Sequence, residues 1–435
     1  MQARLLIAGT AAALAAAVLA LGGALRHAPA AAATDALPTA IAAELQQGFA
    51  AGDMQAEIAG LQGELRLDPT NTKALDTLGL AYLQRVRETG DPTYYGKADG
   101  LLHDALRIAP RDLIATAGLG QLALSRHRFR TALALGLRAQ RISPTTAGVY
   151  GVIGDAEIEL GRYRQAFATF DRMNAIKPDV ALYARVSYAR ELIGHTADAE
   201  KAMALAASAA LGEREASSWT HVQLGLLYLN SGRAHRALVE MRHALQLFPE
   251  YYVALDGMAQ AQIGLGRLRT ARVYEQAAVD RVPLPQYVGL LGDLDAALGQ
   301  HTAAKREYAL IGVIEKLLAA NGVRNDLDIA LFDVDHGVAL RHALALARRG
   351  HEERPSIVGD EVLGWALARN GQCGAALPSS ERALRLGTQD PVKLFHRGFI
   401  EACLGRSPKL WYSRVLALNP RFSVLWAATA RKGAS

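Results

Sequence analysis

A regular spacing of prolines is the feature that most restricts how this chain can fold. Pro110, Pro144 and Pro178 are 34 residues apart, and the same interval separates Pro249 from Pro283. Before each of the last four prolines, two small residues stand 24 and 12 positions upstream. A fixed period of this length is the signature of a structural repeat, whose units pack against their neighbours in a row.

The residues at these positions suit two antiparallel helices. In the unit that ends at Pro178, Gly154 and Ala166 are the small residues, and we expect two helix backbones to approach closely there. Gly161 follows the first helix, where a left-handed backbone favours glycine. Phe170, one turn beyond Ala166, should fill the space between successive helices. Pro178 has no N–H to donate and therefore ends the second helix.

The same pattern recurs in three other units: Gly120, Ala132 and Pro144; Gly225, Ala237 and Pro249; and Ala259, Ala271 and Pro283. It resembles the tetratricopeptide repeat, and the resemblance extends over residues 38–420. The resemblance implies an all-α fold, an α-solenoid of stacked antiparallel helix pairs. It also implies a scaffold that binds a protein or peptide, because the family is known mainly for this function.

The quality of the pattern divides the chain into five segments. We expect a longer turn at the motif GDPTYYG near residue 90, and one long helix from Ala303 to Asn321. The segments are a signal peptide or N-terminal membrane anchor at 1–33, a degenerate repeat at 34–71, regular repeats at 72–285, irregular repeats at 286–420, and a capping helix with the tail at 421–435.

The first segment has the features of an export signal. Arg4 precedes an uncharged run from Leu5 to Leu25, and sites rich in small residues follow it. This run of 21 residues is also long enough to span a bilayer if it is not cleaved. We therefore expect an exported protein that is periplasmic or extracellular, or anchored to the membrane through residues 5–25.

The charge of the chain argues against nucleic acid as a partner. The formal net charge of +6 falls to +4 without residues 1–33, because Arg4 and Arg26 are lost and no acidic residue is. Proteins that bind nucleic acid usually carry a concentrated basic surface, which an excess of this size does not indicate.

No motif points to a metal, a cofactor or a catalytic group. His351 and Glu352 begin like the helix of a zinc protease, but Pro355 stands where the second histidine is needed. The acids of residues 326–335 lack the glycine and distal glutamate of a calcium loop. We expect a non-enzymatic scaffold. The alternatives are a structural subunit of an envelope or secretion assembly, and an enzyme whose site lies in the irregular region 284–355.

The resemblance also implies where a partner binds. In this family the first helices line an inner groove, at sites counted from the glycine of each Leu-Gly pair, and in this chain those sites are mostly acidic. Arg185 is the only clear cation among them, so a basic or neutral partner is expected. Trp219 completes the set of groove candidates, which are Asp76, Gln121, Asp155, Arg185, Trp219, Asp256, Gln260, Asp293, Asp328 and Glu361.

The chain contains two cysteines, Cys373 and Cys403. Cys373 opens the second helix of one expected unit, and Cys403 closes the first helix of the next. Antiparallel stacking places both at the same edge of the solenoid. An exported protein meets an oxidising compartment, so a disulfide is expected, with two buried free thiols as the alternative.

Overall fold

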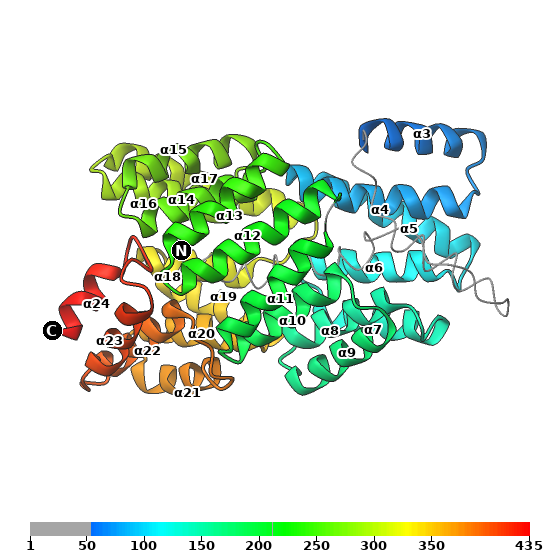
Figure 1. The fold of residues 1–435 in the computed structure, drawn as a ribbon. Helices are drawn as coiled ribbons and strands as arrows, with labels where there is room; N and C mark the ends of the chain where they lie inside the picture. The colour runs from blue at the N-terminus through cyan, green and yellow to red at the C-terminus, as the bar shows by residue number, and fades with distance from the viewer. Residues whose placement is uncertain (1–53, 211) are drawn as a thin grey trace.

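A computed structural model describes residues 54–210 and 212–435. Over these residues the chain forms 22 helices and no strand, so the expected all-α fold is confirmed (Figure 1). The helices of the first half are α3 (Met54–Leu67), α4 (Thr72–Thr89), α5 (Thr93–Ile108), α6 (Leu113–Ser125), α7 (Phe129–Ile142), α8 (Ala147–Glu159), α9 (Tyr163–Ile176), α10 (Val180–Leu192), α11 (Thr196–Ala209), α12 (Arg214–Asn230) and α13 (Ala234–Leu247).

From α4 to α23 the helices form ten antiparallel pairs. The even-numbered helix of a pair is called its first helix below. The helices of the second half are α14 (Tyr252–Gly264), α15 (Leu268–Arg281), α16 (Pro285–Ala297), α17 (His301–Ala320), α18 (Asp326–His336), α19 (Leu340–Glu353), α20 (Ile357–Arg369), α21 (Cys373–Ala383), α22 (Pro391–Cys403), α23 (Lys409–Leu418) and α24 (Ala427–Ala434). Each pair packs closely on the next except at the step from α16 and α17 to α18 and α19, where side chains such as Tyr308 and His336 make the contact.

The repeat residues act as the sequence predicts. Gly161 has a φ of 70°, in the left-handed region, directly after the first helix of its pair. A Cβ atom on Gly154 would lie 2.3 Å from Cε1 of Phe170, so the ring occupies the space that the glycine leaves open. Met241 fills the corresponding space in the unit of α12 and α13, between Gly225 and Gly257.

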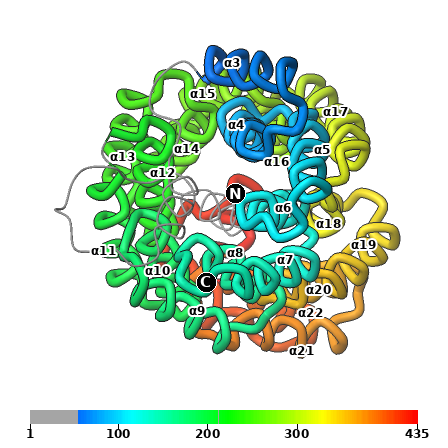
Figure 2. The backbone as a smooth tube through the Cα atoms, turned by 90° about the vertical axis from the view of Figure 1, so that its right-hand side faces the viewer, coloured from blue at the N-terminus to red at the C-terminus, as the bar shows by residue number. Residues whose placement is uncertain are grey.

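First and second helices differ in burial, and this difference explains their composition. Every residue of α8 is buried, whereas α9 buries mainly Tyr163, Ala166, Phe170 and Met173 along one face. A helix that is enclosed on all sides is apolar all round, and a helix on the outside is amphipathic. In Figure 2 the helices form a ring in which α8, α12 and α20 lie closer to the middle than α9, α13 and α21.

Successive turns of the superhelix contact each other directly. Asn321 accepts a hydrogen bond from Arg126, and Asn419 donates one to the carbonyl of Leu229. The bonded residues are 195 and 190 positions apart in the sequence, so one superhelical turn comprises about that many residues. The solenoid is wound so tightly that its turns pack on one another.

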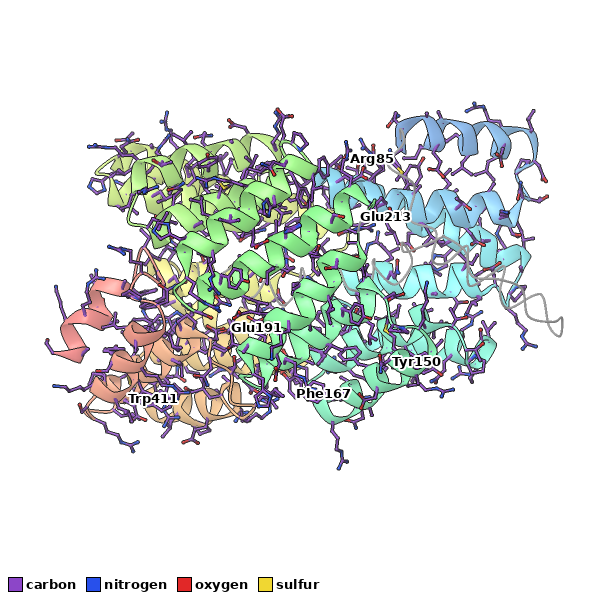
Figure 3. All side chains as sticks on the ribbon, in the orientation of Figure 1. Arg85, Tyr150, Phe167, Glu191, Glu213 and Trp411 are labelled. Atoms are coloured by element: carbon purple, nitrogen blue, oxygen red, sulfur yellow. A yellow bond between two sulfur atoms is a disulfide. The ribbon has the colours of Figure 1, made fainter. Side chains whose placement is uncertain are left out.

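The most buried contact between turns joins α8 to the residues that follow α19. Arg354 pairs with Glu159 although only 4% and 1% of these residues are exposed. The amide N–H of Ile357 donates a hydrogen bond to the hydroxyl of Tyr163 over 2.7 Å in the same region. Glu191, labelled in Figure 3, lies further along this contact, where burial and then the carboxylate of Asp390 raise its pKa to about 7.

Two expectations about helix ends have different outcomes. The long second helix is confirmed, because α17 runs from His301 to Ala320. The longer turn at GDPTYYG is wrong, because α5 already begins at Thr93 and takes up most of the motif. The carboxylate of Asp91 accepts a hydrogen bond from the N–H of Thr93, and Pro92 stands just before the first helical residue, where its missing N–H costs nothing.

The ends of the chain complete the fold. In the segment 421–435, where a capping helix is expected, α24 begins at Ala427 and packs on α23. The structure joins Cys373 and Cys403 in a disulfide between α21 and α22, with Cα atoms 5.7 Å apart. The signal or anchor expected at residues 1–33 lies outside the described residues. In the part of the chain that the structure describes, none of the helices has the length and apolar character needed to cross a bilayer.

Candidate functional site

The ten groove candidates all lie on first helices, from α4 to α20. Nine of them are buried, and Asp328 is partly exposed. Their environments differ. Asp155, Arg185 and Glu361 form ion pairs within the wall of the superhelix, and Trp219, Asp293 and Asp328 line a cavity. Gln260 donates a hydrogen bond to Asp256 over 2.7 Å, and Asp76 and Gln121 are buried on α4 and α6 outside both groups.

Asp155 and Arg185 belong to the wall. The guanidinium of Arg185 donates two hydrogen bonds to the carboxylate, over 2.9 Å from Nε and 2.7 Å from Nη2. Burial raises the pKa of Asp155 to about 6, and the adjacent Arg185 opposes this rise. The pair joins α8 to α10, and a partner would have to displace it to reach either charge.

Glu361 lies in a second buried group of charges. Lys393 Nζ is 3.2 Å from its Oε2, and His396 Nδ1 is 3.0 Å from its Oε1. Lys393 also donates to Asp390 over 2.5 Å. Lys393 and His396 were not among the groove candidates, because they stand five and two positions before Gly398 of α22, whereas the groove sites were counted three positions before and one position after the glycine of each Leu-Gly pair.

A cavity of about 230 Å³ lies where α16, α17 and α18 meet the turn between α4 and α5 and the starts of α12 and α14. The two sides of the cavity come from different superhelical turns. Its walls are mainly apolar, and they include the rings of Tyr95, Trp219, Tyr251, Tyr252, Tyr287 and Phe332.

Three polar atoms of cavity-lining residues have no hydrogen-bond partner among the described residues. They are the indole Nε1 of Trp219, whose side chain is almost entirely buried, Oδ1 of Asp328, and Nε of Arg87, which lies 3.8 Å from Glu215 Oε2. A buried donor or acceptor without a partner costs about 1–3 kcal/mol. A molecule that enters the cavity and supplies the complementary atoms would remove this cost.

A hydrogen-bonded cluster of Asp293, Tyr308 and His336 borders the cavity. Tyr308 donates its hydroxyl proton to Asp293 over 2.9 Å, and His336 Nε2 lies 2.7 Å from the same carboxylate oxygen. His336 Nδ1 lies 2.8 Å from the carbonyl of Phe332. Both ring nitrogens therefore face acceptors, and both can donate only when the ring is protonated. Burial lowers the pKa of His336, but these hydrogen bonds and the charge of Asp293 outweigh it, and the net shift is upward.

Two further acids at the cavity hold protons more strongly than usual. Burial, followed by the charges of Asp333 and Asp328, raises the pKa of Glu315 to about 7. Burial raises the pKa of Asp328 to about 6, although Arg354 opposes the rise. A positive group inserted between Glu315 and Asp328 would stabilise both carboxylates in the charged form.

Comparison with known proteins gives structural neighbours only. No protein-family model matches the sequence, and no curated protein does. Among solved structures, human IFIT1, solved as a dimer with PPP-AAAA, has a TM-score of 0.48 at 17% identity and covers 79% of each chain. The APC/C hetero-tetramer Cut9-Hcn1 has a TM-score of 0.39 at 15% identity, over 87% of this chain and 81% of the other.

The third neighbour is YrrB, described as a TPR protein with an unusual peptide-binding site. Its TM-score is 0.29 at 17% identity, over 42% of this chain and 92% of that one. The TPR-like α-solenoid of this chain rests on its own helix pairs and repeat residues. Likenesses of this degree do not transfer a ligand.

Proposed function

We propose that this chain is a non-catalytic scaffold that binds a segment of a partner protein on the inner side of its superhelix. The cavity carries this proposal, because it combines walls that include aromatic rings with polar atoms that no described residue engages. Trp219 offers an N–H donor and Asp328 a carboxylate oxygen. The complementary groups on a partner are a carbonyl oxygen and a positively charged donor.

The size of the cavity favours a side-chain anchor. Its volume of about 230 Å³ is below the roughly 300–1,000 Å³ of pockets that enclose a drug-sized ligand. Protein interfaces commonly gain most of their affinity from one aromatic or arginine side chain in such a pocket. The rest of the segment would then lie along the first helices.

Charge favours an anchor that joins an apolar stem to a positive end. The lining contains five acids against Arg87, His127 and His336, and Glu315 and Asp328 have raised pKa values. An arginine or lysine side chain places methylenes against aromatic rings and its charge beside carboxylates. The proposed partner is therefore basic.

The geometry of His336 supports binding over catalysis. A general base needs a ring nitrogen with a free lone pair, and both nitrogens of His336 face acceptors. Its raised pKa favours the doubly protonated ring in this position. The cluster with Asp293 and Tyr308 thus supports the cavity wall.

The location of the scaffold is part of the same proposal. The apolar run from Leu5 to Leu25 and the paired cysteines support export, to the periplasm or the exterior or with a membrane anchor. Sequencing the N-terminus of the protein recovered from cell fractions tests this. A cytosolic protein that begins at Met1 would overturn it.

Gly289 provides a direct test of the cavity. It lines the cavity, and a Cβ atom there would lie 3.5 Å from the ring of Phe332, which is ordinary contact. Gly289→Ala should therefore be accommodated, whereas Gly289→Leu places three more carbon atoms in the space. We expect Gly289→Leu to lower partner affinity at least about tenfold and Gly289→Ala to change it less than about threefold.

The partner for this test is found by photo-crosslinking. A benzophenone amino acid in place of Phe332 reacts with whatever occupies the cavity, and mass spectrometry identifies the crosslinked segment. The affinity of that segment as a synthetic peptide is then measured for both Gly289 variants. Equal affinity of Gly289→Leu and Gly289→Ala for the peptide would contradict binding in the cavity.

A further inference from the structure

A second group of potential ligand residues lies outside the cavity, between α12 and α13. His221 is on α12, and Glu240 and His243 are three residues apart on α13. One ligand atom from each side chain lies within 4.8 Å of the other two. None of the three residues lines the cavity, and the proposed peptide-binding function does not use them.

The three side chains converge on one carboxylate oxygen. His221 Nδ1 lies 2.7 Å from Oε2 of Glu240, and His243 Nδ1 lies 3.9 Å from the same atom. The imidazole rings are 5.4 Å apart in an edge-to-face arrangement. Only His221 is within hydrogen-bond distance of Glu240, so the second imidazole is near the carboxylate without bonding to it.

Two imidazoles and one carboxylate are the donors that Zn²⁺ takes in sites that keep an open position. Ligand bonds of about 2.0–2.2 Å in a tetrahedron place neighbouring donor atoms about 3.3 Å apart. The two donor atoms that lie farthest apart must therefore approach each other by about 1–1.5 Å. The side chain of His243 is 49% exposed, which leaves it free to rotate toward Glu240.

The backbone around the group holds the donors in place. Residues three apart on one helix project from the same face, so Glu240 and His243 face α12 together. Close packing of α12 on α13 at Gly225, where a Cβ atom would lie 2.6 Å from Cε of Met241, fixes the distance between the two helices. The third donor, His221, lies one turn before Gly225 on α12.

We propose that His221, Glu240 and His243 bind a divalent transition-metal ion of the Zn²⁺ class, with an open coordination position for water or for a donor group of another molecule. The open position is accessible, because His243 and its neighbours on α13 lie at the surface of the superhelix. The alternative is a hydrogen bond between His221 and Glu240 with a neighbouring histidine.

Titration of the full chain with Co²⁺, without an affinity tag, tests the site. The chain has 12 histidines, so the variants are compared with a control histidine on α13 that lies outside the group. We expect the wild-type protein to bind one Co²⁺ with the visible absorption of a four- or five-coordinate ion, and Zn²⁺ to displace it. His221→Ala and His243→Ala should each weaken binding at least tenfold, and Glu240→Gln should weaken it as well.

His235→Ala is the matched control. His235 is exposed on α13 and stands eight residues before His243, about 12 Å away along the helix. It should bind Co²⁺ like the wild type. Zn²⁺ should also raise the thermal midpoint of the wild type and of His235→Ala, but not of the double variant His221→Ala/His243→Ala. Absence of saturable binding, or equal binding by the wild type and the double variant, would overturn the proposal.

Discussion

Two second helices, α9 and α17, differ in where they stop. In both cases an aromatic ring of the second helix occupies the space beside a glycine of the first helix. Phe170 packs against Gly154, and Tyr308 packs against Gly292. In the first case Ile176 ends a helix of 14 residues, and Pro178 follows. In the second case Lys316 occupies the place of that proline in the repeat, and the helix continues to Ala320.

The longer helix changes what lies inside the superhelix. Ile311, Glu315 and Leu318 of α17 line the cavity, and the next first helix, α18, has only 11 residues. Without a proline at the position of Lys316, α17 is longer than a regular second helix, and the regular stacking of helix pairs is interrupted. The cavity lies at this interruption, whereas regular units are closely packed. The comparison teaches that the repeat pattern provides the packing and that its interruption provides the site.

The largest expected effect concerns the ion pair that joins the regular region to the irregular one. Arg354→Leu leaves Glu159 buried without its partner, because both residues are almost fully enclosed. We expect the free energy of unfolding, measured by urea denaturation, to fall by about 3–5 kcal/mol. The double variant Glu159→Leu/Arg354→Leu is the control, and it should recover most of this loss. If it is no more stable than Arg354→Leu, the unpaired charge is not the cause.

A proline at position 316, equivalent to Pro178, should remove the difference in length between α17 and α9. Lys316→Pro removes one N–H donor from the interior of α17 and introduces a clash with the preceding turn. We expect the free energy of unfolding, measured by urea denaturation, to fall by about 3 kcal/mol. Binding of the partner in the cavity should also be lost. Lys316→Ala, at the same exposed position, is the control and should leave both unchanged. A fully stable Lys316→Pro variant would mean that the end of α17 contributes little.

The regular part of this fold could be predicted from local spacing, because each repeat residue acts on a neighbour in the same or the next unit. Gly154 meets Phe170 and Gly161 adopts a left-handed backbone, as their positions require. The contacts between superhelical turns could not be predicted. Arg354 and Glu159 are 195 residues apart, and no local pattern brings them together.

The candidate site was only partly accessible to sequence reasoning, for a related reason. Counting from Leu-Gly pairs found residues of the inner wall, and Trp219, Asp293 and Asp328 among them line the cavity. The count could not distinguish these three residues from Asp155 and Glu361, which form ion pairs inside the wall with Arg185 and Lys393 respectively. It also could not find Glu315 or Phe332, because a small shift in helix packing decides whether such residues meet a cavity.

The raised pKa of Glu315 should make the free energy of unfolding depend on pH. The pKa of Glu315 is raised from 4.5 to about 7, so the folded state holds a proton that the unfolded chain loses at lower pH. The stabilisation from this group is complete below pH 4.5 and is lost as the pH rises to about 7. The effect is on the order of 1 kcal/mol, discounted for solvent screening at a partly exposed side chain.

Glu315→Gln tests this pH dependence, because the amide cannot ionise. Its free energy of unfolding should fall less than that of the wild type between pH 4.5 and 7, the range given by the raised pKa. Glu64→Gln, at an exposed position on α3, is the control and should follow the wild-type profile. Identical profiles for Glu315→Gln and the wild type would show that Glu315 does not hold a proton in the folded state.

The smallest single effect is expected for Gly289→Ala, and its comparison with Gly154→Ala sets an open space directly against a filled one. Gly154→Ala forces a methyl group against the buried ring of Phe170 and should cost about 1–3 kcal/mol. Gly289→Ala meets Phe332 at ordinary contact distance and removes a flexible residue from α16, so it should stabilise the protein by about 0.5–1 kcal/mol. Urea denaturation of both variants measures the two signs. Destabilisation by Gly289→Ala would mean that the cavity wall at α16 is as tightly packed as a regular repeat, and that the space beside Phe332 does not exist in solution.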